Sequence, residues 1–70
     1  MISYKPLLHL LVDRGMSREK LRQKIGASMA TMVKFAKNEY VSLDVICRIC
    51  AVLNCRIQDV VEYIPDSQDD

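Results

Sequence analysis

The chain has 70 residues, half of them hydrophobic, and a formal net charge of +1 at pH 7. A chain of this length forms one domain with a single modest core, and its apolar runs are much shorter than a membrane span. It has no Trp and only two Gly and two Pro, which favours helices over a turn-rich β-fold. We therefore expect an all-α domain, and the lack of a visible signal peptide predicts a cytoplasmic location.

Five helices are predicted from apolar spacing and end signals, over about residues 5–14, 18–25, 29–37, 43–53 and 57–63. Residues 1–3 are expected to be frayed or to lie loosely on the surface. The first helix begins near Pro6 and ends at Gly15, because Pro fits a first turn and Gly fits a left-handed end. Its inward face is expected to consist of Leu7, Leu8, Leu11 and Val12.

The stretch from residue 16 to residue 38 predicts two short helices joined by a tight turn at Gly26. Glycine supplies the positive φ that ends the first of them, and Ser17 and Ser28 each precede a helical run that a hydroxyl can cap. Helical spacing predicts that the two helices share one buried seam, formed by Leu21, Ile25, Met32, Phe35 and Ala36.

The last two helices are predicted from the same kinds of signal, namely capping residues and apolar spacing. Ser42 is expected to cap the fourth helix, and Asn38 and Asn54 to adopt left-handed conformations at helix ends. The core stripe of the fourth helix is predicted to be Leu43, Ile46, Cys50 and Leu53. The fifth helix is expected to bury Val60, Val61 and Ile64 before Pro65 stops it, and residues 66–70 read as a disordered acidic tail.

Charge is distributed unevenly along the chain. Between Arg14 and Lys37 there are seven basic residues and one acidic residue, a local net charge of +6, whereas residues 38–70 carry a net charge of −5. Such asymmetry predicts one surface that faces a polyanion, although a solvated cationic face is an equally ordinary interpretation of charge alone.

The cysteines and the single histidine leave two interpretations open. Cys47, Cys50 and Cys55 could ligate zinc or an iron–sulfur cluster with a fourth ligand, and His9 is the only imidazole in the sequence. However, Cys50 falls in a helical core stripe, where a buried cysteine acts as a small hydrophobe. The favoured interpretation is that the cysteines and His9 are structural and that the chain binds no metal or cofactor.

The chain resembles the Cro/C1-type family of helix-turn-helix domains, the phage-repressor-like group of DNA-binding proteins. The residues that carry the resemblance are Leu21, Ile25-Gly26, Ser28, Thr31-Met32, Phe35 and the run from Ile49 to Cys55, which reads Ile-Cys-Ala-Val-Leu-Asn-Cys. It extends over about residues 4–65 and implies a five-helix lambda-repressor-like bundle. It also implies double-stranded DNA as the partner, with the second helix of the motif in the major groove.

Family positions imply a role for individual residues. Those that match base-reading positions are Ser28, Met29, Ala30, Thr31 and Lys34; those that match backbone contacts are Ser17, Arg18, Arg22, Lys37, Asn38 and Tyr40. Lys34 is expected to donate to guanine, and Met29 or Ala30 to pack on a thymine methyl group. Tyr40 is equally interpretable as a residue that packs its loop against the preceding helix.

The chain departs from the family pattern at two places. Position 22, where the family usually has a small residue, is Arg22, whose aliphatic stem is expected to cover the helix seam while the guanidinium reaches solvent or phosphate. Positions 29 and 30, which often carry long polar side chains in phage repressors, are Met and Ala. We therefore expect less direct hydrogen-bonded readout and more weight on shape and phosphate contacts.

The predicted function is sequence-specific DNA binding by a transcriptional regulator, expected to act as a homodimer because one short helix contacts few bases. A protein–protein interaction module of the same fold, antitoxin-like or adaptor, is the alternative. Enzyme function is rejected because no catalytic couple or phosphate loop is visible, and no small-molecule ligand is expected. The dimer surface is predicted on the fourth and fifth helices, at the exposed members of the set Val45, Ile49, Val52, Val61 and Tyr63.

Overall fold

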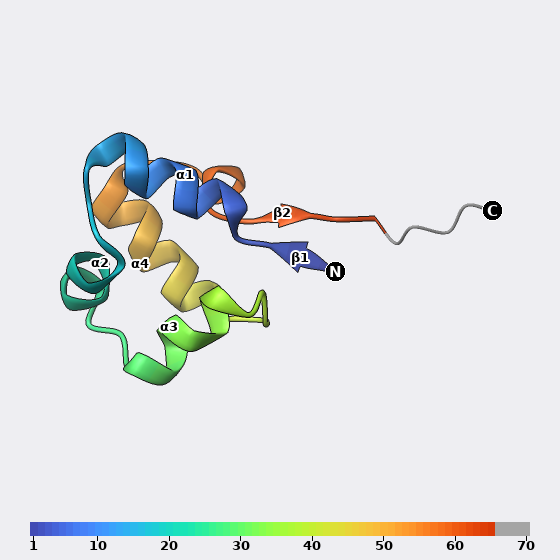
Figure 1. Ribbon diagram of the computed structural model, residues 1–70, viewed down its shortest axis with the longest axis horizontal. Helices are drawn as coiled ribbons and strands as arrows, with labels where there is room; N and C mark the ends of the chain where they lie inside the picture. Colours follow the sequence, from blue (N-terminus) through green and yellow to red (C-terminus); the bar gives the residue numbers. More distant parts are fainter. Residues whose placement is uncertain (66–70) are drawn as a thin grey trace.

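The computed structural model describes residues 1–65. Its elements are β1 (Ile2–Ser3), α1 (Lys5–Arg14), α2 (Arg18–Ile25), α3 (Met29–Ala36), α4 (Leu43–Leu53), the 3₁₀ turn η1 (Ile57–Asp59) and β2 (Glu62–Tyr63). The predicted helical fold is confirmed, and α4 runs through the middle of the molecule (Figure 1). Within residues 1–65, no helix has the length and apolarity needed to cross a membrane. The acidic tail predicted for 66–70 lies outside the described residues.

Three serines begin three of the helices, as predicted. Ser17 Oγ accepts the Lys20 N–H at 3.0 Å, Ser28 Oγ accepts the Thr31 N–H at 3.2 Å, and Ser42 Oγ accepts the Val45 N–H at 3.4 Å. Each serine has an extended backbone, so its side chain can satisfy an N–H group that has no partner inside the helix. Local hydrogen bonding of this kind therefore fixes where α2, α3 and α4 start.

Left-handed residues end three of the helices. Gly15 has φ 63° after α1, Gly26 has φ 68° after α2, and Asn54 has φ 51° after α4. Asn38 is also left-handed, as predicted, with φ 56°. The third helix ends one residue earlier than predicted because Lys37, with φ −98° and ψ 4°, is already its capping residue.

The core lies where α1, α2, α4 and η1 meet, and its side chains come from every helix. Its buried members are Tyr4, Leu7, Leu11, Leu21, Ile25, Phe35, Ile46, Ile49, Leu53 and Val60. Half-buried residues such as Met32, Cys50 and Val61 pack around it. The core is therefore continuous from the first helix to the last turn, as expected for one domain of this size.

The exposed faces of α1 and α4 differ from the prediction. Leu8 and Val12 are exposed instead of inward, because α1 turns the face made by Leu7 and Leu11 to the core. In α4, Leu43 is exposed, whereas Ile49, predicted at the surface as a dimer contact, is completely buried. Ile46 and Leu53 are buried as predicted, Ile49 completes the buried stripe of α4, and Cys50 lies at its half-buried edge.

The predicted fifth helix is wrong, and so are the frayed residues 1–3. The chain makes only η1 and then enters β2, which pairs antiparallel with β1 in the register Ile2 with Tyr63 and Ser3 with Glu62. Val60 is buried at this point, whereas Val61 and Ile64 are half-buried. The β-branched and aromatic residues after position 59 favour a strand once a partner strand is available. That partner lies at the other end of the described chain, so a local pattern does not reveal it.

Candidate nucleic-acid interface

The segment from α2 to α3 forms a helix-turn-helix. Leu21, Ile25 and Phe35 are buried and confirm the predicted seam, Met32 is half-buried, and Ala36, also predicted there, is exposed. The Ala27 N–H donates to the Arg22 carbonyl at 3.1 Å and closes the turn after α2. Phe35 therefore anchors one side of α3 to the core and leaves the opposite side of this helix at the surface.

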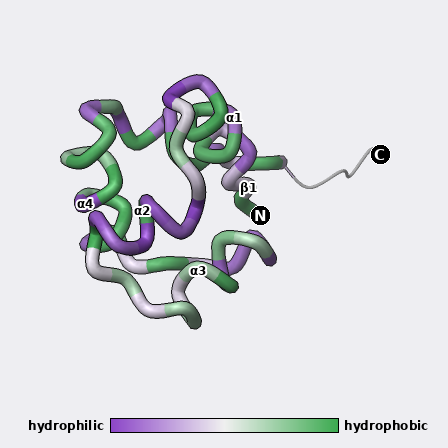
Figure 2. The backbone as a smooth tube through the Cα atoms, turned by 60° about the vertical axis from the view of Figure 1, so that its left-hand side comes forward, coloured by the Kyte–Doolittle hydropathy of each residue, from purple (hydrophilic) through white to green (hydrophobic). Residues whose placement is uncertain are grey.

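The surface of α3 carries the predicted base-reading residues. Ser28, Met29, Ala30 and Lys34 are exposed, and Thr31 is half-buried. Figure 2 shows how α3 contrasts with the hydrophilic α2: most of α3 is coloured white to green, whereas α2 is largely purple. The exposed part of α3 is thus mainly apolar and lies beside a strongly cationic helix.

Two of these residues bond to each other. Ser28 Oγ lies 3.1 Å from Thr31 Oγ1 and also accepts the Thr31 N–H, so both hydroxyl groups have partners within the first turn of α3. This arrangement stabilises the start of the helix by satisfying one of its free N–H groups. It also leaves these side chains with less hydrogen-bonding capacity for a base edge than the family positions implied.

Arg22 is held inside the motif. Its guanidinium donates to both carboxylate oxygens of Glu19, from Nε at 2.9 Å and from Nη2 at 2.6 Å, while Nη1 donates to the Ala27 carbonyl at 3.2 Å. Hydrogen bonding from Arg22 lowers the pKa of Glu19, and the same bond to Glu19 raises the pKa of Arg22. In this conformation the guanidinium links α2 to the turn that follows it, and the role of Arg22 as a backbone contact stays a prediction.

The other predicted backbone-contact residues are exposed, and two of them are also engaged within the domain. The Ser17 hydroxyl caps α2, and the side-chain oxygen of Asn38 accepts the Tyr4 N–H at 3.0 Å. Arg18, Lys37 and Tyr40 lie at the surface. The structure therefore places one exposed cation at the start of α2 and another directly after α3.

Tyr4 is a residue of this region that the sequence marked only as a helix boundary. It is 2% exposed, and its hydroxyl donates to the Glu39 carbonyl at 2.7 Å. Its ring packs edge-on against the Phe35 ring, with the two ring centroids 4.7 Å apart. Burial raises the pKa of Tyr4, and a backbone hydrogen bond with Val41 partly lowers it. Tyr4 thus fixes the loop after α3. An aromatic residue just before a helix was its only sequence signal.

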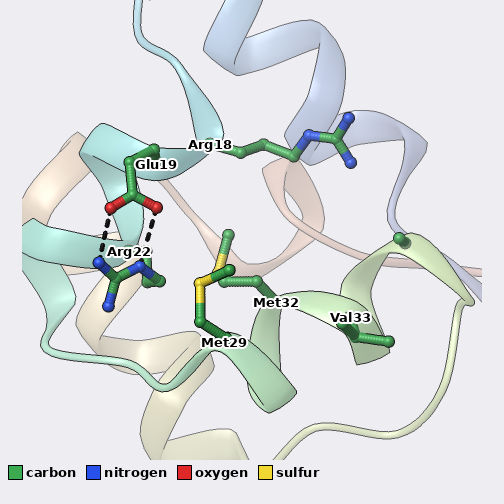
Figure 3. Close-up of a pocket in the computed structure, with 7 residues that line it drawn as sticks. Arg18, Glu19, Arg22, Met29, Met32 and Val33 are labelled. Atoms are coloured by element: carbon green, nitrogen blue, oxygen red, sulfur yellow. Dashed lines mark hydrogen bonds and ion pairs between the residues drawn. The ribbon is translucent and has the colours of Figure 1, made fainter.

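A shallow groove of about 250 Å³ lies between α2 and α3. Its α2 wall consists of Arg18, Glu19 and Arg22, and its α3 wall includes Met29, Met32 and Val33. Figure 3 shows Arg18 extended from the start of α2, the paired Glu19 and Arg22, and the two methionines that project from α3. The groove therefore combines an apolar wall with a wall of charged side chains.

The cysteines do not gather into a metal site. Cys47 is exposed, Cys50 and Cys55 are half-buried free thiols, and His9 is exposed. Within residues 1–65, no three His, Cys, Asp or Glu side chains are placed to hold a metal ion together. Burial, together with the neighbouring Cys50, raises the pKa of the Cys55 thiol to about 11. Cys50 and Cys55 therefore act as small packing residues at the end of α4.

The chain is similar to known proteins in both sequence and structure. The crystal structure of the transcriptional regulator VanUg, form II, superposes with a TM-score of 0.90 at 45% sequence identity, covering 93% of this chain and 87% of that chain. No curated protein is detectably similar to the chain. Residues 6–66 match the Cro/C1-type HTH DNA-binding domain. The chain therefore belongs to the Cro/C1-type helix-turn-helix family of DNA-binding domains.

Proposed function

We propose that this domain is a sequence-specific transcriptional regulator that inserts α3 into the major groove of DNA. The observation that carries the proposal is the geometry of α3: Phe35 buries one side of the helix, while Met29, Ala30 and Lys34 are exposed, with the exposed cation Lys37 directly after the helix. An α-helix presented in this way fits the major groove, and a cation next to it suits the phosphate backbone. The likeness to VanUg, a transcriptional regulator, also supports the proposal.

The first test is a salt titration of binding to the DNA upstream of the gene, with a random duplex of equal length as the control. Cationic contacts to phosphates predict a steep loss of affinity with salt for both duplexes. A sequence-reading regulator binds the upstream duplex more tightly at every salt concentration. Absence of binding to either duplex at low salt would refute the proposal and favour the alternative, a protein-interaction module.

Two lysines separate base reading from phosphate binding. We expect Lys34→Ala to weaken specific binding by about 1–3 kcal/mol and to relax specificity, if Lys34 donates to a guanine. Lys37→Ala should weaken binding to all duplexes alike and reduce the salt slope by about 1. Arg56→Ala, which removes an exposed cation next to η1, serves as the charge-matched control. Equal effects of both lysine variants on random DNA would contradict the assignment.

We also propose that the domain binds DNA as a dimer, because one short helix contacts few bases and paired half-sites supply the rest. Of the apolar residues predicted for the dimer surface, Ile49 is buried and thus unavailable, whereas Val52 and Tyr63 are exposed. We assign the contact to the exposed side chains of these two residues, one on α4 and one on β2. Sedimentation velocity at micromolar concentration, with and without a duplex that carries two half-sites, tests this; monomers under both conditions would refute it.

A further inference from the structure

The exposed face of α3 has little hydrogen-bonding capacity left for bases. Of the five predicted base-reading residues, Met29 and Ala30 are apolar, and Ser28 and Thr31 use one of their two O–H donors in the bond of 3.1 Å between their hydroxyls. Lys34 is the remaining one with a strong donor, and within residues 1–65 its ammonium group makes no hydrogen bond or ion pair. The donors left for base edges on this face are therefore Lys34 and one hydroxyl, fewer than five base-reading positions would offer if all were polar.

The same face has apolar surface that no other part of the described chain covers. Met29 is 65% exposed and Val33 is 48% exposed, and both line the groove against α2. They are four residues apart in one helix, so their side chains lie on one side of it. Met32, half-buried beneath them, extends the apolar lining of the groove toward the core.

The charges around this apolar surface indicate what covers it. Arg18 stands at the edge of the groove, and the sequence from Arg14 to Lys37 carries a net charge of +6, which suits a polyanion. Among the groups that base pairs present in the major groove of DNA, the apolar one is the C5-methyl group of thymine. A helix in that groove can therefore bury its exposed Met and Val side chains most favourably against thymine methyl groups.

We propose that Met29 and Val33 read thymine C5-methyl groups, so that the preferred binding site is selected by the position of its thymines. The inference rests on the proposed DNA-binding function. It differs from hydrogen-bonded readout in one measurable respect: removal of the methyl group alone, with every donor and acceptor of the base pair kept, must weaken binding.

Replacing single thymines by deoxyuridine performs this change. The preferred duplex is first selected from a random library, and each of its thymines is then replaced in turn. At the positions that face Met29 and Val33 we expect an affinity loss of about fourfold per methyl group, equivalent to the roughly 0.8 kcal/mol of burying one methylene-sized group. The other thymines should tolerate the replacement within about twofold.

Protein variants assign the effect to the groove. In the double variant Met29→Ala/Val33→Ala the preference for thymine over deoxyuridine should disappear, whereas Val12→Ala, at a residue of α1 that is 79% exposed, should keep it in full. Because all three residues are exposed, urea unfolding should show that each variant is folded. A duplex with 5-methylcytosine paired to guanine at the sensitive position should retain part of the affinity that unmodified cytosine loses, since it supplies the same methyl group.

The outcomes separate this inference from the proposed function. Selection of a defined sequence whose thymines all tolerate deoxyuridine would overturn the methyl readout and leave the DNA-binding function intact. Retention of the full thymine preference by the double variant would also overturn the assignment to Met29 and Val33. If the library yields no enriched sequence, the proposed function itself fails, and the inference fails with it.

Discussion

Replacing Tyr4 by Phe removes one buried hydroxyl group and leaves the rest of the residue in place. The ring can keep its edge-on contact with Phe35, and the backbone N–H of residue 4 can still donate to Asn38. What disappears is the 2.7 Å hydrogen bond from the hydroxyl to the Glu39 carbonyl. The variant therefore isolates the contacts of the hydroxyl, with the Glu39 carbonyl and the Val41 backbone, to the loop that follows α3.

The size of the effect follows from the local exposure. An intramolecular hydrogen bond contributes about 0.5–1.5 kcal/mol to the free energy of unfolding. Glu39 is exposed, so water can reach its carbonyl in the variant and limit the loss to about 1 kcal/mol. With a urea dependence of about 1 kcal/mol per molar for so small a domain, the midpoint of unfolding should fall by about 1 M.

Urea unfolding followed by the helical circular dichroism signal measures this shift. Tyr40→Phe is the matched control because Tyr40 is 77% exposed, and its midpoint should stay within the error expected for a surface substitution. Equal midpoints for Tyr4→Phe and Tyr40→Phe would refute the assigned contribution of the bond. A loss of more than about 3 kcal/mol would mean that the ring had also moved, since one hydrogen bond does not account for it.

The pH dependence gives an independent check of the same residue. Burial raises the pKa of Tyr4 above its ordinary value of 10.0, which is the value expected in the unfolded chain. As the pH rises past that value, the unfolded chain loses the proton first, so unfolding is favoured and stability falls through the raised pKa. The Tyr4→Phe variant lacks this group and should lose less stability than the parent chain between neutral pH and this alkaline range.

Three further predictions concern other elements. Phe35→Ala should cost about 3–5 kcal/mol and leave the domain largely unfolded, whereas Val33→Ala on the exposed side should change little; comparable thermal midpoints would contradict the assigned core role. Gly26→Ala should cost about 1–2 kcal/mol from backbone strain alone, because φ is 68° and no atom lies within 4 Å of the added methyl group; an unchanged urea midpoint would refute this. Iodoacetamide at pH 8 should label the exposed Cys47 well before Cys55, whose labelling should rise only as the pH nears about 11; mass spectrometry that finds Cys55 labelled first would contradict the burial argument.

Local signals in the sequence were sufficient for the boundaries of α1, α2 and α4 and for the start of α3. The serine caps and the left-handed Gly15, Gly26 and Asn54 depend on residues within one turn, so they could be predicted without knowledge of the fold. The buried side of α1 and α4 was harder to predict. Runs such as Leu7-Leu8 give a helix two possible apolar faces, and tertiary packing decides which of them is buried. The strand pair between β1 and β2 could not be predicted, since it joins the two ends of the described chain.

The candidate site also has features that the sequence predicted and features that it did not. Family spacing identified the residue types on the surface of α3, and the structure exposes Met29, Ala30 and Lys34 as expected. Spacing did not reveal that Arg22 is held by Glu19 and by the turn, because that depends on one side-chain conformation. Nor did it show the role of Tyr4, whose partner at Glu39 is 35 residues away. Contacts of this range are set by the assembled fold.

The short strand pair also joins the two ends of the described chain by backbone hydrogen bonds. The Ile64 N–H donates to the Met1 carbonyl at 2.8 Å, and the two residues are 63 positions apart. Closing so long a flexible loop costs about 4 kcal/mol of chain entropy, more than a pair of two-residue strands can supply. The helices must therefore bring the two ends together before β1 and β2 can pair. We expect β1 and β2 to pair last in folding and to separate first when the domain is heated.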